Sequence, residues 1–485
     1  MRIPLCFSAA LLWMAALATG CSKESAEPSA FILDSQGRAL ILRGTNVDNH
    51  AKHDELHAVD MPDEEIRFFA RELGLNFVRY LVFWSGLEPE PGVHDEGYLD
   101  RIEADLDRFH QEGIYILLDM HQDVYSRRFC CDGAPEWAIR DDGEDFVEQA
   151  SWFTNYFQPA VQAAFDNFWA YTDGDHADLQ DHYFGTLQKL AKRFRDHPAV
   201  LGYDIMNEPH PGSEFDALEA LDPTIESFSS RSFDEEKLHP FYQRAINAIR
   251  EVDDDGWIFF EPRYGSPGNG GASYIPELND PRKGNPRLVY APHLYSVTLE
   301  ATGRYDAESD RTIELWEEQR KEDLERQPMP IVLGEWGLTY GTENAEAFVN
   351  ELAELSERML LSWAHWSWDP GGPTSWALYD REAKAPNPLF HAVERPYPRA
   401  TAGEPISLSF DEETRTLEYR WRARDGAKGD TELYFPPARD EGSEAFEIEL
   451  GEGALYRWDE AIPGLLLITK VPAEDEHRLI IRPKI

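Results

Sequence analysis

Short apolar runs of strand length alternate with amphipathic, helix-length segments between about residues 31 and 395. Segments 64–73 and 99–112 have helical spacing and end at Gly74 and Gly113, the residue type that most often follows a helix. Several of the apolar runs are continuous, which is typical of strands covered on both faces. Eight runs have the length of strands: 40–47, 77–84, 115–121, 200–207, 257–261, 288–295, 331–335 and 363–368.

Eight strands in alternation with helices predict an α/β fold, a (β/α)8 TIM barrel with long insertions over residues 31–396. A doubly wound open sheet is the alternative fold. It usually has fewer strands, and no glycine-rich phosphate-binding loop follows the first strand here.

The pattern changes after residue 396. Short segments, often of alternating polarity, are separated by Gly, Pro and Asp turns, as in segments 406–410, 416–421, 431–435, 446–450, 465–469 and 477–481. This pattern predicts a small antiparallel β-sandwich over residues 397–485.

The first twenty residues carry one charged side chain, Arg2, followed by an apolar run from Ile3 to about Ala18. The run is short for a bilayer span, which takes ~20 residues. It ends in small residues directly before Cys21, as in a bacterial lipobox, so residues 1–20 are predicted to be a lipoprotein signal peptide. We expect lipidation of Cys21, a flexible tether over residues 21–30, and membrane contact through the lipid. Ordinary cleavage that leaves a free Cys21 is the alternative.

Charge excludes several classes of partner. Lys and Arg number 46 and Asp and Glu number 91, a formal net charge of −45. Such a chain repels nucleic acid and anionic membrane surfaces. The acidic excess is compatible with a salty habitat. Together with the leader, it predicts an exported bacterial lipoprotein at the outer membrane or cell surface, which we expect to be a monomer.

Polar side chains gather where the predicted strands end, which is the mouth of a barrel and the usual place of its active site. Two of them are the carboxylates Glu208 and Glu335. A separation of about 5 Å between two such groups suits retaining glycoside hydrolysis, in which one is the nucleophile and the other the acid/base. The acid needs a raised pKa, whereas the nucleophile must be ionised.

Neighbouring residues fit this chemistry. Arg79 would keep the nucleophile charged, Tyr295 would hydrogen-bond to it, and Asn207 would bind a sugar hydroxyl. His121 and His293 would hold sugar hydroxyls or tune the acid, and Trp368 would offer a flat face to a sugar ring. Because carboxylates and water suffice for both steps, we expect neither a metal nor an organic cofactor.

Two motifs carry a family resemblance. Residues 203–209 read Tyr-Asp-Ile-Met-Asn-Glu-Pro and residues 333–337 read Leu-Gly-Glu-Trp-Gly. They resemble the acid/base and nucleophile motifs of glycoside hydrolase family 5, whose active-site set recurs here in the expected order: Arg79, His121, Asn207, Glu208, His293, Tyr295, Glu335 and a tryptophan on the eighth strand.

Within that family the chain resembles the endoglycoceramidases, through Leu-Asp-Met-His-Gln-Asp-Val-Tyr-Ser at 118–126, Ala-Pro-His-Leu-Tyr at 291–295 and Trp-Ser-Trp-Asp-Pro-Gly at 366–371. The resemblance implies hydrolysis of the β-bond between glycan and ceramide, with Glu208 as acid/base and Glu335 as nucleophile. It also implies sugar contacts by Lys52, His121, Asp123, Asn207, Tyr295 and Trp368. A surface amine at Lys52 and a loop cap at Asp123 are the alternative readings.

The loop over residues 127–137 departs from the endoglycoceramidase pattern, since it lacks a longer glycine-rich insertion and contains adjacent cysteines, Cys130 and Cys131. These cysteines either form a disulfide that stiffens the loop or are two thiols without a role. Because this loop should border the mouth, the substrate stays open between a one- or two-sugar glycolipid and a glycoside of another aglycone such as a sterol.

Aromatic residues crowd positions 137–169, where Phe165, Phe168 and Trp169 are expected in the core and others would line a groove for lipid chains. Alternative functions are a family 5 endo-β-glucanase, an exo-acting glucosylceramidase or steryl glucosidase, and a surface lipoprotein that captures glycans without cleaving them.

Overall fold

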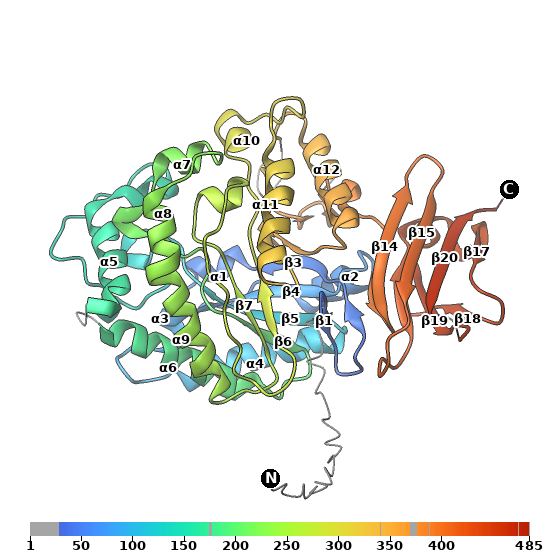
Figure 1. Cartoon of the computed structure of the whole chain (residues 1–485), viewed down its shortest axis with the longest axis horizontal. Helices are drawn as coiled ribbons and strands as arrows, with labels where there is room; N and C mark the ends of the chain where they lie inside the picture. The colour runs from blue at the N-terminus through green and yellow to red at the C-terminus, as the bar shows by residue number, and fades with distance from the viewer. Residues whose placement is uncertain are drawn as a thin grey trace, which may run out of the picture.

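The structure, a computed structural model, describes residues 29–173, 177–339, 341–368, 376–387, 389–473 and 475–484. The predicted signal peptide, most of the tether, and Cys21 lie outside the described residues. Figure 1 shows a large α/β body and a smaller β body at the C-terminal end of the chain.

Eight parallel strands form the larger body, hydrogen-bonded in the order β8-β7-β6-β5-β4-β3-β10-β9. Their bounds are β3 Arg43–Val47, β4 Phe77–Phe83, β5 Tyr115–His121, β6 Val200–Asp204, β7 Trp257–Phe260, β8 Leu288–Tyr290, β9 Val332–Trp336 and β10 Ser362–His365. Parallel bridges from Tyr290 to Ile331 and from Leu294 to Trp336 join the two end strands, so the sheet closes into a barrel.

Helices surround the barrel (Figure 1). Those of this body are α1 Asn49–His53, α2 Asp63–Arg71, α3 Trp84–Leu87, α4 Glu96–Gln111, α5 Pro159–Trp169, α6 Ala177–Phe194, α7 Ala217–Leu221, α8 Phe228–Phe233, α9 His239–Arg250, α10 Val297–Thr302, α11 Thr312–Arg326, α12 Ala345–Arg358 and α13 Phe390–Val393. The predicted ends of α2 and α4 are confirmed, because Gly74 and Gly113 follow them with φ of 65° and 72°. Glycine reaches this left-handed region without a steric penalty.

The smaller body contains two antiparallel sheets. One has the order β14-β15-β20-β17, and the other has the order β1-β2-β13-β16-β19-β18. The strands are β1 Ile32–Leu33, β2 Ala39–Leu40, β13 Tyr397–Thr401, β14 Glu404–Asp411, β15 Thr416–Arg422, β16 Thr431–Tyr434, β17 Phe446–Glu449, β18 Leu455–Trp458, β19 Leu465–Lys470 and β20 Glu476–Pro483, with α14 Pro436–Glu441 between β16 and β17. The predicted TIM barrel followed by a β-sandwich is confirmed.

The sandwich braces the barrel at the end opposite its mouth. The hydroxyls of Tyr397 and Tyr434 donate to the carbonyl oxygens of Gly74 and Glu72 at 2.7 and 3.1 Å, between the end of α2 and the start of β4. The N-terminal hairpin β1–β2 pairs with β13, so the chain enters the barrel from the sandwich sheet.

Candidate active site

Glu335 lies within β9 at the barrel mouth, and its side chain is held by two donors. Arg79 Nη1 donates to Glu335 Oε1 at 2.8 Å, and the Tyr295 hydroxyl donates to Oε2 at 3.0 Å. The residue is 5% exposed. Charge-assisted hydrogen bonds of this kind stabilise an ionised carboxylate, which is the state that a nucleophile requires.

Glu208 faces Glu335 from the loop after β6. One oxygen of each carboxylate lies within 4.8 Å of the other, and His293 is within the same distance of both. Burial raises the pKa of Glu208 to about 7, with the Glu335 charge adding to the rise and a 2.9 Å hydrogen bond from His293 opposing it. Glu208 therefore keeps its proton up to about neutral pH, as a general acid must.

The backbone at Glu208 has a φ of 43°, a left-handed conformation that is uncommon for residues with a side chain. Its N–H donates to Glu261 Oε2 at 2.8 Å, and Gln122 Nε2 donates to its carbonyl oxygen at 3.0 Å. These two bonds hold the strained backbone and so aim the side chain at Glu335.

Arg79, on β4, is fully buried and holds the centre of the site. Besides Glu335, its guanidinium donates to Asn207 Oδ1 at 2.9 Å and to Glu261 Oε1 at 2.8 Å. Burial alone would lower the pKa of Arg79, but Asp119 and the other carboxylates around it raise that pKa well above its ordinary value. Arg79 therefore stays charged, and its bonds fix the positions of several site residues at once.

His293 links the two carboxylates. Its Nδ1 lies 3.6 Å from Glu335 Oε2, and its Nε2 lies 3.2 Å from Glu261 Oε1. Burial lowers the pKa of His293, but Glu261 and Glu335 outweigh that effect and raise the pKa well above its ordinary value. A charged His293 therefore donates a hydrogen bond to Glu208 and forms an ion pair with Glu335.

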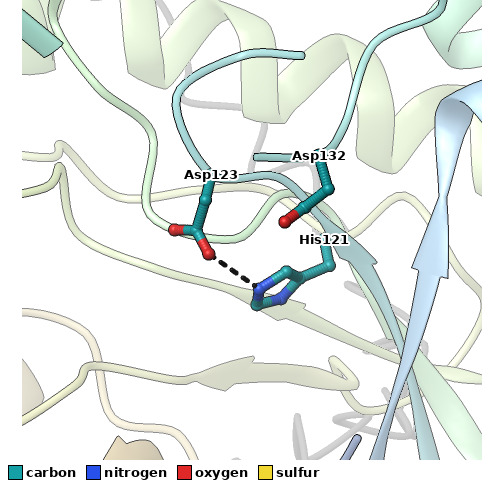
Figure 2. A group of neighbouring side chains, drawn as sticks. All are labelled: His121, Asp123 and Asp132. Atoms are coloured by element: carbon teal, nitrogen blue, oxygen red, sulfur yellow. Dashed lines mark ion pairs between the residues drawn. The ribbon is translucent and has the colours of Figure 1, made fainter. Parts of the chain in front are cut away.

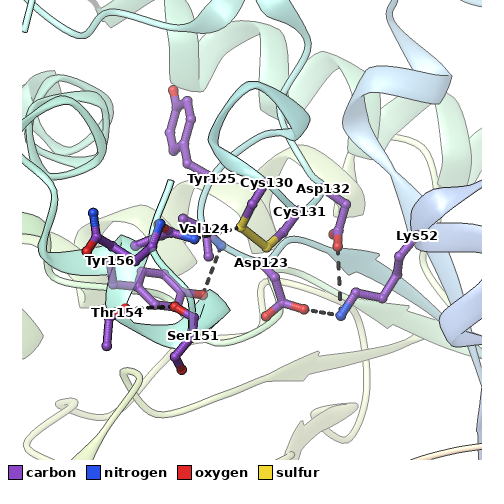
Figure 3. The surroundings of a disulfide bond; sticks show 12 residues. Lys52, Asp123, Val124, Tyr125, Cys130, Cys131, Asp132, Ser151, Thr154 and Tyr156 are labelled. Atoms are coloured by element: carbon purple, nitrogen blue, oxygen red, sulfur yellow. Dashed lines mark hydrogen bonds and ion pairs between the residues drawn. A yellow bond between two sulfur atoms is a disulfide. The ribbon is translucent and has the colours of Figure 1, made fainter. Parts of the chain in front are cut away.

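A second group of side chains lies beside the pair, at the ends of β3 and β5. His121 Nδ1 is 2.7 Å from Asp119 Oδ2, and its Nε2 is 3.4 Å from Asp123 Oδ2 (Figure 2). Lys52 forms an ion pair with Asp123, and its Nζ is 3.8 Å from Asp132 Oδ2 (Figure 3). The predicted sugar-contact residues Lys52, His121 and Asp123 thus meet at one place.

One tryptophan lies elsewhere than predicted. Trp368 is fully buried: its ring stacks on Tyr379 at 5.1 Å, and its indole N–H donates to Glu65 at 3.0 Å. With its apolar face and its polar N–H both engaged by other side chains, it offers no face to a sugar. Trp366 does lie at the site, where it stacks on His121 at 5.4 Å and has Lys52 Nζ 4.8 Å above its ring.

Asn207 reaches the centre of the site, where its Oδ1 accepts a hydrogen bond from Arg79 and its Nδ2 donates to the Gln122 carbonyl oxygen at 3.0 Å.

The sequence prediction missed Glu261, which contacts Glu208, His293 and Arg79. Glu261 directly follows β7, so its strand-end position was the signal that could have identified it.

Cys130 and Cys131 form a disulfide in the loop after β5 (Figure 3). The structure therefore favours the stiffened loop over two free thiols. Asp132 follows directly and is fully buried.

Three clusters of carboxylate and imidazole groups have metal-like spacing among the described residues: His121 with Asp123 and Asp132, Glu208 with His293 and Glu335, and Asp119 with Asp204 and Glu261. Each already has a cationic partner. Lys52 pairs with Asp123, Arg79 pairs with Glu335, and Arg79 also pairs with Asp119, Asp204 and Glu261. The positive charge that a metal would supply therefore comes from side chains in all three.

Aromatic rings lead from the carboxylate pair to the surface. Burial and the charge of Glu208 both raise the pKa of Tyr264. The ring centre of Tyr264 lies 6.0 Å from that of Phe215, and the Phe215 ring lies 5.7 Å from that of Phe157. Phe157 contacts Phe153, and both rings are 37% exposed. As predicted, Phe165, Phe168 and Trp169 are core residues, each at most 2% exposed.

Comparisons with known proteins agree with this site. Residues 33–372 match the cellulase model of glycosyl hydrolase family 5, and residues 395–481 match the family 5 C-terminal domain. Endoglycoceramidase I of Rhodococcus hoagii (strain 103S) is 27% identical over 456 residues, which cover 91% of this chain and 84% of that protein.

Solved structures of endo-glycoceramidase II from Rhodococcus sp. are also similar. The complex with ganglioside GM3 has 32% identity and a TM-score of 0.84, covering 95% of this chain and 100% of that one. The lactosyl-enzyme intermediate has 33% identity and a TM-score of 0.82, covering 94% and 100%. The chain therefore belongs to glycoside hydrolase family 5 and to its endoglycoceramidase-like branch.

Proposed function

We propose that this protein hydrolyses the β-glycosidic bond between the glycan and the ceramide of glycosphingolipids, with retention of configuration. The observation that carries the proposal is the carboxylate pair at the barrel mouth. One oxygen of Glu208 lies within 4.8 Å of one oxygen of Glu335. This closeness suits a retaining enzyme, whose carboxyl groups are about 5–5.5 Å apart, better than an inverting one, whose groups are about 6.5–9.5 Å apart.

In the first step Glu335 attacks the anomeric carbon of the sugar that is bonded to the lipid. The bond from that carbon to the glycosidic oxygen breaks, and Glu208 gives its proton to the departing oxygen. Ceramide leaves as an alcohol, and the glycan stays on Glu335 as an ester.

In the second step Glu208, now ionised, removes a proton from a water molecule that attacks the same carbon. The ester bond breaks, the glycan leaves with a new hydroxyl, and Glu208 regains its proton. Arg79 and Tyr295 stay hydrogen-bonded to the Glu335 carboxylate that this step regenerates.

Two groups of side chains at the site suit the two halves of an amphiphilic substrate. Lys52, His121 and Asp123 offer donors and acceptors for sugar hydroxyls, and Trp366 offers a ring face. The aromatic rings of Tyr264, Phe215 and Phe157 form an apolar path that suits hydrocarbon chains. A soluble β-glucan would leave that path unused.

The test is mass spectrometry of the products from a panel of glycosphingolipids and sterol glucosides in detergent micelles, with a soluble β-glucan for comparison. We expect intact oligosaccharide and intact ceramide. Stepwise loss of terminal sugars, or cleavage of β-glucan alone, would contradict the proposal.

We further infer that the protein is exported as a monomeric lipoprotein and held at the outer membrane or cell surface through Cys21. The support is the leader sequence and the cysteine after its small residues. Among the residues that the structure describes, no helix is both long and apolar enough to span a bilayer.

A further inference from the structure

We propose that Asp132 is a positioning residue for the sugar-binding group Lys52–His121–Asp123, and that the adjacent Cys130–Cys131 disulfide holds Asp132 in place. This inference rests on the proposed glycan-binding role of that group. Asp132 would act through Lys52, since its own side chain is 0% exposed.

The loop brings two carboxylates to the same ammonium group. Asp123 ends one arm of the loop, and Asp132 returns beside it, where the N–H of Asp132 donates to the Asp123 carbonyl at 3.2 Å. In Figure 3, dashed lines join the Lys52 ammonium to both carboxylates. Paired with two carboxylates, the ammonium of a long and flexible side chain is held at one place.

Asp132 has no other evident role. Neither of its carboxylate oxygens accepts a hydrogen bond from any residue in the described part of the chain, although both are buried. Burying a carboxylate without donors is unfavourable, because the group loses its hydration. The charge of Lys52, 3.8 Å away, offsets part of this cost, and His121 contributes as well.

The loop needs support to hold this arrangement. Val124, Tyr125 and Cys130 have φ values of 54°, 71° and 100°, which are rare for residues with side chains. The Tyr156 hydroxyl accepts from the Val124 N–H at 3.0 Å and so supports one strained position. The disulfide supports another, because linking adjacent side chains closes a small ring around the peptide that joins Cys130 to Cys131.

The loop is also tied to the helix that carries Lys52. Arg127 Nη2 donates to the Lys52 carbonyl oxygen at 3.0 Å. A second bond ties the loop to the segment Trp152–Phe157, where Asn155 Nδ2 donates to Cys130 Sγ at 3.2 Å. A displaced loop would therefore move both the backbone and the counter-ion of Lys52. The expected consequence is weaker binding of the glycan, with less effect on the chemistry at Glu208 and Glu335.

The first test is the isosteric variant Asp132→Asn, with exposed Asp145→Asn from the same connection as the matched control. Burial raises the pKa of Asp132 to about 7, the Asp123 charge adds to the rise, and Lys52 and His121 oppose it. We therefore expect Asp132 to be mostly protonated at pH 6 and mostly ionised at pH 8.

For lactosylceramide, the ratio of variant to wild-type KM should stay below about twofold at pH 6 and reach about tenfold at pH 8, with kcat changed less than about threefold. Taking this ratio at each pH cancels the titration of Glu208. If Asp132 had only a structural role, this KM ratio would not change with pH. The same ratio of variant to wild-type KM at both pH values, or a loss confined to kcat, would overturn the proposal.

The second test is the double variant Cys130→Ser/Cys131→Ser, which should raise KM about tenfold at pH 8. In this background Asp132→Asn should add little, since both changes remove one interaction. Dithiothreitol, which supplies two electrons and two protons as it closes into its own disulfide, should reproduce the effect on the wild type without any substitution. The reagent should leave the double variant unaffected.

Near-UV circular dichroism checks that each variant is folded. If reduced wild type, confirmed by mass spectrometry of alkylated thiols, keeps its KM, the disulfide has no positioning role. If the wild type releases no glycan from lactosylceramide, the proposed function fails instead, so the two failures can be told apart.

Discussion

Glu208 and Glu335 carry the same functional group in different surroundings, and the surroundings assign their roles. Glu335 accepts hydrogen bonds from Arg79 and Tyr295, so its charge is compensated. Glu208 is buried near that charge, and its hydrogen-bond donor is His293. An ionised nucleophile and a protonated acid follow from this difference in environment.

The pKa of Glu208 makes a testable prediction about pH. Because Glu208 must be protonated in the first step, kcat/KM for a glycolipid should fall as pH rises through about 7. Glu208→Ala should lose about 10²- to 10⁴-fold on a glycolipid. It should lose far less on an aryl glycoside whose leaving group needs no proton, and there the fall near pH 7 should disappear. A fall near pH 7 that persists in the variant would assign the titration to another group.

At the residue scale, the sequence identified the carboxylate pair but not every partner. Trp366 and Trp368 both follow the last barrel strand, and nothing in the pattern distinguishes the tryptophan at the site from the one stacked on Tyr379. Glu261 was missed because its contacts with Glu208 and Arg79 exist only once three strand ends have met.

At the scale of elements, all eight barrel strands were predictable, because strands buried on both faces are continuous apolar runs. The N-terminal hairpin was not predictable as part of the sandwich. Its strands β1 and β2 contain two residues each, too few for a pattern, and their partner β13 lies more than 350 residues later in the chain. The sequence likewise did not decide whether Cys130 and Cys131 form a disulfide or stay as two thiols.

The order of elements also explains why the site is rigid. Arg79, His121 and Glu335 project from β4, β5 and β9 of one closed sheet, and the sandwich contacts the opposite end of the barrel. The loops after β5 and β6 take part in the central hydrogen bonds, because Asn207 accepts from Arg79 and Gln122 donates to the carbonyl oxygen of Glu208.

At the scale of the whole molecule, the charge of −45 describes the surface more than the site. Most of the carboxylates repel one another across solvent, and salt screens this repulsion over a Debye length of about 3 Å at 1 M. The buried bonds of Arg79 are screened much less.

We therefore predict that the protein stays folded and active in about 1 M sodium chloride. The measurement is near-UV circular dichroism together with hydrolysis of a soluble aryl glycoside, which avoids the effect of salt on micelles. Loss of folded protein between low and molar salt would show that self-repulsion does not dominate its surface electrostatics.

The central claim is that Glu335 is the nucleophile of a glycolipid hydrolase. The most direct test is release of oligosaccharide from lactosylceramide by Glu335→Gln, compared with the wild type at the same protein concentration. Since a neutral amide cannot form the glycosyl ester, we predict that hydrolysis is abolished while the circular dichroism spectrum stays that of the wild type. Release of glycan by the folded variant at the wild-type rate would contradict the account.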